Sequence, residues 1–375
     1  MSIIGIDAKR AFMNFSGLGN YSRAFISAMS SYYPQRRYIL YTPKNRLRPG
    51  MEDFLNSPQI EVRMPHGLNA LLSSMLWRSH TISRNIAADG VELYHGLSGE
   101  LPLSPISAKR VVTMHDAIFM RFPQLYKPID RRVYAKKFAA ACKNADKIVA
   151  ISRATADDII HYFGADPAKI EVIYQGCDRI FYNIPSQSDV ELVRAKYSLP
   201  PKYILSVGTI EERKNLVTTV RALKELPSEI SLVAVGRPTP YMERVKAAIS
   251  ELGLESRVQF IHGASFADFP AIYKGAEALV YISIYEGFGL PVLEGITVGV
   301  PVVTSNLSAM PEAGGDAVCL VDPSNSSLTA KALKEICYTP GFAEEMVRRG
   351  YAYSKNFVDT KMAASVNEIY DSLLK

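Results

Sequence analysis

The sequence predicts an α/β protein made of two doubly wound domains in tandem, each with a parallel sheet covered by helices. The chain has 375 residues, which is too many for one ordinary α/β core and comfortable for two. Short apolar runs rich in β-branched residues alternate with longer helical patterns, as in parallel β-α-β units. This alternation is interrupted over residues 181–200 and then starts again. We therefore expect two similar domains joined by that stretch.

The first half supplies the N-terminal domain, residues 1–180. Its apolar runs predict strands at Ile3–Asp7, Tyr38–Thr42, Ile60–Met64, Val91–His95, Val111–Met114, Lys147–Ile151 and Ile170–Tyr174. The longer segments between these runs predict helices that include Asn20–Ser30, Leu68–Ala87, Asp130–Lys143 and Ser152–Phe163. Leu68–Ile86 carries apolar residues at helical spacing, and this pattern favours a core helix over a helix lying on a membrane surface.

The second half repeats the pattern over residues 201–360. Strands are predicted at Tyr203–Val207, Ser231–Val235, Val258–Ile261, Ala278–Ser283, Val300–Thr304 and Val318–Val321. Residues 181–200, with Pro185 and the Leu199-Pro200-Pro201 break, predict an irregular interdomain connection. In doubly wound sheets, ligands bind beyond the carboxyl ends of the strands, so we expect the binding residues in the segments that follow each strand.

Composition narrows the class of protein. The formal net charge is +6, and residues 1–180 contribute 24 Lys and Arg against 15 Asp and Glu. This excess suits an anionic partner, such as a phospholipid surface, a lipid pyrophosphate or a nucleic acid, but ordinary surface charge explains it equally well.

The four cysteines are widely spaced, which favours a reducing compartment over a disulfide framework or a zinc site. With no run long enough to span a bilayer and no apolar leader, we expect a cytoplasmic protein, and contact with the inner face of the membrane is left open.

Two segments of the second half carry candidate binding residues. The first segment is Tyr285–Glu294, in which Gly287 and Gly289 allow close backbone approach to a ligand. Pro291 suits the start of a helix. We therefore expect Glu286 in the loop before the helix and Glu294 in the first helical turn. An ordinary βα turn with a glutamate near a helix N-terminus is the alternative. In Gly208–Asn215, Arg213 and Lys214 follow a strand and suit a diphosphate. A solvated charged turn is the alternative there.

The first half offers weaker candidates. Gly17-Leu18-Gly19-Asn20 predicts a small loop before a helix that approaches a phosphate or moves on binding, without matching the dinucleotide fingerprint. His115 follows a strand and is placed to hydrogen-bond a sugar, although a structural histidine is the commoner case. Asp7 ends the first strand and Glu100 follows another, and either is placed to approach an acceptor.

Together, these segments resemble the GT-B-fold retaining glycosyltransferases of family 4 (glycosyl transferases group 1), especially bacterial mannosyltransferase-like members. The resemblance is collinear and covers nearly the whole chain, adding the segments 145–152, 173–178, 301–305, 311–312 and 320–323 to those named above. It implies two Rossmann-like domains facing a cleft, with the nucleotide on the second domain and most of the acceptor site on the first. It also implies that a final helix, residues 361–375, crosses back to the N-terminal domain.

The resemblance implies roles for individual residues. Arg213 and Lys214 match positions that neutralise the donor diphosphate, Glu286 matches the first glutamate of the E-x7-E motif near the donor sugar, and Glu294 matches the second, on the ribose. His115 matches a histidine that reaches the donor sugar, so the resemblance implies that Glu286, His115, Arg213 and Lys214 are the catalytic residues. The remaining donor-binding positions implied are the loop and backbone positions Gly19, Gly208, Gly287, Phe288, Gly289 and Leu290. His262 replaces a glycine that is usual in the family, which leaves the donor base open.

The implied reaction is transfer of a hexose with retained configuration, with mannose from GDP-mannose as the leading donor. The implied acceptor is a glycan or lipid-linked glycan of a surface polysaccharide. The sequence contains no D-x-D, so we expect no metal and no cofactor, and we expect no nucleic acid partner. Two alternatives stay open: a nucleotide-sugar-binding protein without transfer activity and a GT-B-fold nucleotide-sugar 2-epimerase. A phosphorylase is disfavoured, because it needs a lysine-bound pyridoxal phosphate and the sequence has no motif for one.

Overall fold

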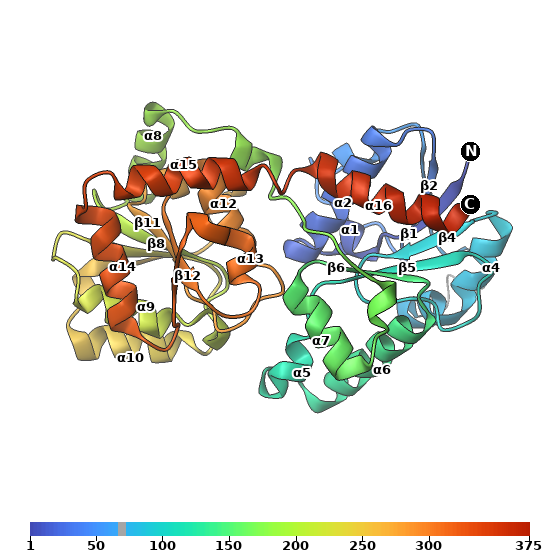
Figure 1. The fold of residues 1–375 in the computed structure, drawn as a ribbon, viewed down its shortest axis with the longest axis horizontal. Coiled ribbons are helices and arrows are strands. Elements are labelled where there is room, and N and C mark those ends of the chain that lie inside the picture. The colour runs from blue at the N-terminus through green and yellow to red at the C-terminus, as the bar shows by residue number, and fades with distance from the viewer. Residues whose placement is uncertain (67–72) are drawn as a thin grey trace. The chain divides into compact units, whose positions relative to one another are not determined.

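The computed structural model describes residues 1–66 and 73–375 (Figure 1). The chain divides into two compact units. Unit 1 comprises Met1–Gly176 together with Phe357–Lys375, and unit 2 comprises Cys177–Asn356. Each unit is built around one parallel sheet, so the predicted class of two doubly wound α/β domains is confirmed.

Unit 1 contains a seven-stranded sheet in the order β3-β2-β1-β4-β5-β6-β7, and every pair of neighbours is parallel. Its strands are β1 (Ile3–Asp7), β2 (Arg37–Tyr41), β3 (Ile60–Arg63), β4 (Leu93–Gly96), β5 (Lys109–Met114), β6 (Lys147–Ala150) and β7 (Ile170–Val172). The strand order reverses between β1 and β4, so the two loops that leave this point start side by side.

The principal helices of unit 1 are α1 (Lys9–Met13), α2 (Gly17–Tyr32), α3 (Ser74–Leu76), α4 (Ile82–Ala88), α5 (Ile118–Arg121), α6 (Pro128–Asn144), α7 (Arg153–Phe163) and α16 (Asp359–Leu374). Helix α7 shows how local sequence sets the ends. The Ser152 side chain accepts a hydrogen bond from the Thr155 N–H at 2.9 Å, and Gly164 ends the helix with φ 60°.

The C-terminal helix α16 belongs to unit 1, although unit 2 separates it from the rest of that unit in sequence. The Arg36 guanidinium donates to Asn367 Oδ1 at 2.9 Å and to Asp371 Oδ1 at 2.6 Å. Buried His95 lies 2.7 Å from the Tyr370 hydroxyl, and burial lowers the His95 pKa to about 3. The imidazole is therefore neutral at neutral pH, and the end of the chain is fixed to the sheet through polar contacts in the interior.

Unit 2 contains a six-stranded parallel sheet in the order β10-β9-β8-β11-β12-β13. Its strands are β8 (Tyr203–Val207), β9 (Ser231–Val235), β10 (Val258–Ile261), β11 (Ala278–Tyr281), β12 (Val302–Ser305) and β13 (Cys319–Val321). Its helices are α8 (Gln187–Tyr197), α9 (Leu216–Lys224), α10 (Met242–Leu252), α11 (Phe269–Lys274), α12 (Leu290–Val298), α13 (Met310–Gly314), α14 (Ser326–Tyr338) and α15 (Phe342–Ser354).

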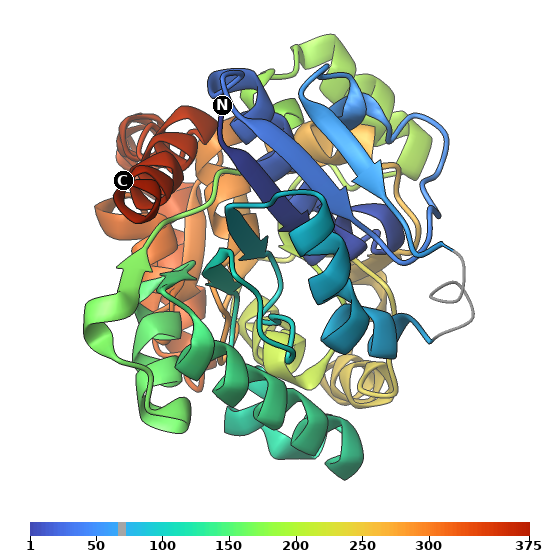
Figure 2. The ribbon, with the colours of Figure 1, turned by 90° about the vertical axis from the view of Figure 1, so that its right-hand side faces the viewer.

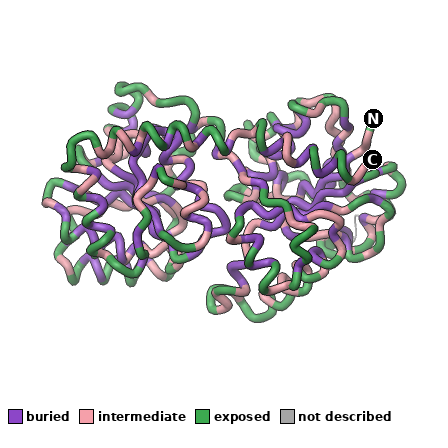
Figure 3. The backbone as a smooth tube through the Cα atoms, viewed as in Figure 1, coloured by how far each residue is buried: buried purple, intermediate pink, exposed green. Residues whose placement is uncertain are grey.

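Both faces of each sheet are buried, which explains why the strands read as continuous apolar runs. In β2, Tyr38 and Leu40 pack into a cluster with residues of α2 and α16, whereas Ile39 and Tyr41 pack into another with Trp77 and residues of α4. Figure 3 shows the buried backbone concentrated along the strands of both units, and Figure 2 shows unit 1 with its helices around the sheet.

The structure differs from the sequence prediction in two segments. Residues 181–200 are not irregular throughout, because α8 occupies Gln187–Tyr197. Ser186 and Asp189 form a reciprocal capping box at its start. Within the predicted helix Leu68–Ala87, residues 68–72 lie outside the described part of the chain, and a π-helical turn, Trp77–Thr81, connects α3 to α4. Trp77 is fully buried, whereas Met75 and Leu76, two other apolar residues of that pattern, are 56% and 50% exposed, so the core interpretation holds for only part of the segment.

Candidate functional site

The candidate site of unit 2 lies where its strand order reverses. Strands β8 and β11 are parallel neighbours, so the loops that follow them leave the same edge of the sheet. Residues 208–215 follow β8, and residues 282–289 follow β11. The Ile284 N–H donates to the Arg213 carbonyl at 2.9 Å, which joins the two loops directly. Sequence segments about 70 residues apart therefore form one surface.

The loop after β8 has a defined backbone. Gly208 has φ 125°, a conformation that favours glycine, and a short 3-10 turn follows at Glu212–Lys214. Asn215 then adopts the left-handed conformation with φ 61°. Its side-chain amide donates to the Pro323 carbonyl at 2.6 Å, and its Oδ1 accepts from the Thr218 hydroxyl at 2.8 Å. These contacts fix the position of Arg213 and Lys214.

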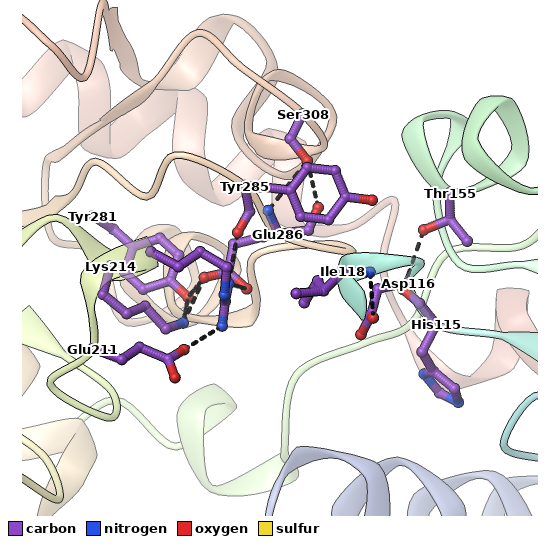
Figure 4. Close-up of polar contacts among 11 residues, drawn as sticks. His115, Asp116, Ile118, Thr155, Glu211, Lys214, Tyr281, Tyr285, Glu286 and Ser308 are labelled. Carbon is purple, nitrogen blue, oxygen red and sulfur yellow. Dashed lines mark hydrogen bonds and ion pairs between the residues drawn. The ribbon is translucent and has the colours of Figure 1, made fainter. Parts of the chain in front are cut away.

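Arg213, Lys214 and Glu286 form one ion-pair cluster. Figure 4 labels Lys214 and Glu286 of this cluster, with Tyr281 and Glu211 beside them. Arg213 Nη1 lies 2.6 Å from Glu286 Oε2 and donates to the Tyr285 carbonyl at 2.6 Å. Lys214 Nζ lies 2.6 Å from Glu286 Oε1 and also donates to the Tyr281 hydroxyl, which in turn donates to Glu286 Oε1 at 2.8 Å. The structure thus brings together three of the four residues predicted to be catalytic.

The environment of the cluster sets its charges. The side chains of Arg213 and Glu286 are each 11% exposed. Burial would raise the Glu286 carboxyl pKa, but the Lys214 and Arg213 charges outweigh it and lower this pKa to about 2. Burial lowers the Lys214 pKa, and Glu286 opposes that shift. Glu286 is therefore ionised at neutral pH, beside two cationic side chains.

This arrangement can hold an additional anion. Two of the three N–H donors of Lys214 are used by Tyr281 and Glu286, and Arg213 divides its donors among Glu286, Tyr285 and Glu211, whose Oε1 lies 2.6 Å from Nη2. A phosphate group bound here would compete with the Glu286 and Glu211 carboxylates for these donors. The cluster is therefore suited to stabilise charge on a phosphate group.

The segment after Glu286 leads into α12. Gly289 occupies the N-cap position with φ 109°, and an added Cβ would lie 2.7 Å from Met310 Cε. Leu290 is the first helical residue, and Phe288 is buried. The Ser308 hydroxyl donates to the Glu286 carbonyl at 2.5 Å and accepts from the Glu286 N–H at 3.2 Å. Gly287–Leu290 are thus held at the start of a nine-residue helix, whose free N–H groups favour anions.

The sequence predicted Glu294 in the first helical turn, and this prediction is wrong. Glu294 is the fifth residue of α12, because the helix begins at Leu290. Its Oε2 accepts a hydrogen bond from the Tyr273 hydroxyl at 2.6 Å, and burial raises its pKa to about 7. Glu294 therefore changes protonation near neutral pH, unlike Glu286.

His262 occupies the loop after β10. Its ring is stacked against Phe260 with an interplanar angle of 16°, and its Nδ1 lies 2.7 Å from the Gly236 carbonyl. An exposed, hydrogen-bonded imidazole replaces the small residue that the resemblance led us to expect.

In unit 1, Asp7 and Glu100 are held by cations that the sequence analysis did not select. Arg78 pairs with Asp7 Oδ2 through Nη2 and with Glu100 Oε2 through Nη1, the latter at 3.1 Å. Lys137 Nζ lies 3.0 Å from the same Glu100 oxygen. The crevice that Asp7 lines has a volume of about 10 Å³, which is too small for a sugar ring. Asp7 is therefore part of a buried ion-pair network, as is Glu100.

His115 and Gly19 occupy the same region of unit 1. His115 Nε2 lies 2.8 Å from the Leu97 carbonyl and therefore carries the proton, and burial lowers the His115 pKa to about 4. Its ring makes an edge contact with Tyr21, with 4.6 Å between centroids. Gly19 lies in the first turn of α2 rather than in a loop, and a Cβ there would collide with the Asn14 carbonyl. Close packing within unit 1 thus requires this glycine.

A pocket of about 170 Å³ lies within unit 1 beside His115. Its lining combines an aromatic group with a few polar side chains. The aromatic group is Phe119, Tyr126, Tyr134 and Phe138, and the polar side chains include Arg10, Ser98, Glu100, His115 and Asp116. In Figure 4, the Ile118 N–H bonds the Asp116 carboxylate, at 3.1 Å, where the strand β5 gives way to α5. The pocket thus offers flat apolar faces and hydrogen-bonding groups, which suits a polar ring.

Sequence reasoning missed Tyr281, Glu211 and Arg78. Tyr281 is the last residue of β11 and stood inside a predicted strand, so its position at the carboxyl edge was the available signal. Glu211 was visible as a charged neighbour of Arg213. Arg78 gave no usable signal, because its partners Asp7 and Glu100 lie far from it in the sequence.

Among residues 1–66 and 73–375, no group of three or more His, Cys, Asp or Glu side chains is arranged to hold a metal ion. In the same part of the chain, every helix is too short or too polar to cross a membrane.

The chain resembles known proteins along most of its length. Residues 189–353 match the model of the glycosyl transferases group 1, and residues 24–179 match that of Glycosyltransferase Family 4. The chain is 30% identical over 272 residues to the O-antigen chain mannosyltransferase B of Escherichia coli, covering 71% of this chain and 70% of that one. It is 28% identical over 308 residues to the serotype-specific mannosyltransferase WbdA of Escherichia coli, covering 78% of this chain but only 38% of that longer protein.

A solved structure shares the fold. The Anabaena protein Alr3699/HepE in complex with UDP-glucose superposes with a TM-score of 0.77 at 19% identity, over 99% of this chain and 100% of that one. The agreement covers both sheets of the present chain.

Proposed function

Because the chain belongs to the group 1 glycosyltransferases, we propose that it transfers mannose from GDP-mannose to a glycan or lipid-linked glycan, with retention of configuration and without a metal ion. The observation that carries the proposal is the buried cluster of Arg213, Lys214 and Glu286 at the carboxyl edge of the unit 2 sheet. Mannose is chosen because the relatives described above are named as mannosyltransferases.

In the proposed reaction, the bond between the sugar C1 and the diphosphate oxygen breaks, and negative charge develops on the leaving diphosphate. Arg213 and Lys214 stabilise this charge, and the start of α12 adds N–H donors. A phosphate oxygen takes the proton of the acceptor hydroxyl, which attacks C1 from the face that the diphosphate leaves. A protein nucleophile is then unnecessary, and Glu286 acts by positioning the two cations and contacting the donor sugar.

Glu294 is assigned to the ribose of the donor. Its carboxyl pKa of about 7 means that it accepts hydrogen bonds from the ribose hydroxyls better as the pH rises above that value. Gly208 and the Gly287–Leu290 segment provide backbone close to the diphosphate. A Cβ added at Gly19 would lie 1.9 Å from the Asn14 carbonyl oxygen, so packing within unit 1 alone accounts for this glycine, and its contact with the donor stays a prediction.

Unit 1 is proposed to hold the acceptor in the aromatic pocket. A sugar ring presents C–H groups that pack on Phe119 and Tyr134 and hydroxyls that reach Glu100 and Asp116. Neutral His115 donates through Nε2 to Leu97, which leaves Nδ1 as an acceptor for a sugar hydroxyl. Asp7 has no direct role in this proposal, because Arg78 holds it outside the pocket.

A donor panel tests the proposal. Thermal unfolding of the full chain is measured with GDP-, UDP- and ADP-sugars, and a ligand at 100 times its Kd stabilises the folded state by about 2.7 kcal/mol. GDP-mannose is expected to shift unfolding most. Incubation with a lipid-linked acceptor must then release GDP and yield an α-linked product, in the presence of EDTA as in its absence.

Other outcomes identify the alternatives. Binding without GDP release indicates a nucleotide-sugar-binding protein, and conversion of the donor to its 2-epimer without an acceptor indicates an epimerase. Loss of turnover in EDTA, restored by a divalent cation, contradicts metal independence. If only UDP-sugars stabilise the protein, glycosyl transfer remains the proposed reaction, but GDP-mannose is not the donor.

A further inference from the structure

Glu100 belongs both to a buried ion-pair network and to the aromatic pocket of unit 1. It lines that pocket, and it also lines the narrow crevice beside Asp7 and Arg78. Its side chain is only 14% exposed. Burial would raise the Glu100 carboxyl pKa, but the charges of Arg78 and Lys137 outweigh burial and lower it. Glu100 is therefore a negatively charged carboxylate at a pocket that suits a polar ring.

Both cations contact the same oxygen of this carboxylate. Arg78 Nη1 lies 3.1 Å from Glu100 Oε2, and Lys137 Nζ donates to that oxygen at 3.0 Å. Glu100 Oε1 accepts no hydrogen bond from the residues that the structure describes. Since each carboxylate oxygen can accept about two hydrogen bonds, Oε1 keeps its capacity to accept one from a ligand.

The element that carries Arg78 is attached to the loop that carries Glu100. Arg78 lies in the π-helical turn Trp77–Thr81, a type of turn that is frequent at functional sites. In the same turn, the Ser79 carbonyl accepts a hydrogen bond from the Leu103 N–H at 2.7 Å. The guanidinium and the carboxylate are thus connected through the backbone as well as through their ion pair.

The backbone just before Glu100 is tightly packed. A Cβ added at Gly96 would lie 2.0 Å from the Glu100 carbonyl oxygen, and one added at Gly99, where φ is 71°, would lie 2.5 Å from Phe138 Cζ. The Gly99 N–H donates to the Thr113 carbonyl at 2.9 Å. These contacts fix the loop against β5 and α6, and with it the base of the Glu100 side chain.

Stability alone accounts poorly for this arrangement. Burial removes water from both members of an ion pair, and well-packed apolar side chains of similar volume are often at least as stabilising. The Arg78 Nε atom is buried and has no hydrogen-bond partner in the described part of the chain, so the network leaves one of its own donors unsatisfied. What the network does provide is a fixed position for one charged carboxylate beside the pocket.

We propose that Arg78 and Lys137 are positioning residues for Glu100, and that Glu100 Oε1 selects acceptor sugars by one unmodified hydroxyl group. A carboxylate only accepts hydrogen bonds, so it binds a hydroxyl and does not bind a deoxy, O-methyl or O-acetyl position. When a buried carboxylate lacks its expected donor, the lost hydrogen bond is not replaced by water, so discrimination is strong. This inference rests on the proposed function, because it defines the acceptor class of the same pocket.

Binding of octyl glycosides to the full chain tests the selection without requiring transfer. The octyl glycosides of mannose, glucose, galactose and N-acetylglucosamine are titrated by saturation-transfer NMR, and the best binder is then compared with its monodeoxy derivatives. The wild type is expected to bind one derivative at least about tenfold more weakly than the parent, since a hydrogen bond to a charged group is lost. In Glu100→Ala, the parent and that derivative are expected to bind within about twofold of each other.

The ratio of parent affinity to derivative affinity also tests the positioning role, because a general loss of stability would change both affinities together. Lys137→Met removes one cation from Oε2 and is expected to lower this ratio at least about threefold. Lys137→Arg keeps a charged donor and is expected to restore most of the ratio. Arg78→Lys cannot bridge two carboxylates and is expected to lower the ratio as Lys137→Met does.

The matched control is Lys147→Met. It removes a comparable pair in unit 1, since Lys147 Nζ lies 2.9 Å from Glu171 Oε1, but Lys147 does not line the pocket. It is expected to keep the wild-type ratio. A retained Trp77 fluorescence transition verifies that unit 1 of each variant is folded.

The outcomes separate the selection from the proposed function. The selection is overturned if the wild type binds no octyl glycoside, if it binds every monodeoxy derivative as well as the parent, or if Glu100→Ala keeps the wild-type ratio. Equal ratios in Lys137→Met and Lys147→Met would overturn the positioning role. GDP release from GDP-mannose on addition of the best-binding glycoside tests the proposed function: selective binding without transfer contradicts that function and supports the selection by Glu100.

Discussion

Replacing Glu286 with Gln removes one charge from the buried cluster and keeps the shape of the side chain. The folded-state pKa of about 2, compared with the ordinary value of 4.5, corresponds to about 3 kcal/mol of stabilisation of the ionised form at 1.36 kcal/mol per pKa unit. Glu286→Gln should therefore lower the free energy of unfolding of unit 2 by about 3 kcal/mol at pH 7. In urea, this is a shift of about 1–2 M in the unfolding midpoint, for a slope of about 2 kcal/mol/M.

The single tryptophan allows the two units to be followed separately. Trp77 lies in unit 1, so its fluorescence reports unfolding of that unit, whereas far-UV circular dichroism reports both. We expect Glu286→Gln to move part of the dichroism transition and to leave the fluorescence transition in place.

Glu345→Gln is the matched control. The Glu345 carboxyl also has two arginine partners, Arg348 and Arg349, and their hydrogen bonds also lower its pKa to about 2. Glu345 lies on the surface of α15, however, where water and salt screen the pairs. We expect a much smaller change for Glu345→Gln. Equal effects of the two substitutions, or no effect of Glu286→Gln, would refute the argument that burial makes the Glu286 cluster strong.

Three further predictions concern the Glu286 cluster of unit 2 and the Arg78 network of unit 1. Because the Glu286 pKa is lower in the folded state than in the unfolded chain, wild-type unit 2 should lose stability as the pH falls from about 4.5 to 2, and acid titration of dichroism should show that Glu286→Gln lacks this component. Lys214→Ala should reduce the steady-state transfer rate by about 10²–10³-fold, because it removes one cation from the leaving diphosphate, and a rate within threefold of wild type would contradict that role. Arg78→Met leaves Asp7 and Glu100 without their shared cation and should cost about 3–5 kcal/mol in the Trp77 fluorescence transition, whereas an unchanged midpoint would show that the network contributes little.

Much of the fold could be predicted because the strands are buried on both faces. Such strands are continuous apolar runs, and Ile3–Asp7, Tyr203–Val207, Ser231–Val235 and Val258–Ile261 were predicted at their observed bounds. Residues 181–200 were predicted to be irregular because they contain prolines. Ser186 and Asp189 nevertheless form a capping box that starts a helix in this segment. Proline and serine signal both loops and helix starts, and only the tertiary packing decides between them.

The candidate site was predictable to the extent that its residues follow strands. Arg213, Lys214 and Glu286 were selected for that reason, and the order of strands in the sheet brings them together. Their pairing could not be read from spacing, because it depends on β8 and β11 being neighbours although β9 and β10 separate them in sequence. Arg78 was missed for the same reason, since Asp7 lies 71 residues away in the sequence. Tyr281 lies only five residues before Glu286, and its place at the end of a strand was a signal that the sequence offered.

The most direct test of the central claim is the affinity of the full chain for GDP, measured by titration calorimetry in the wild type and in Lys214→Gln. The claim is that the cationic pair of unit 2 binds the donor diphosphate. It predicts that Lys214→Gln weakens GDP binding by at least tenfold while guanosine, which lacks phosphates, binds both proteins equally. Equal GDP affinity in two folded proteins would contradict the claim.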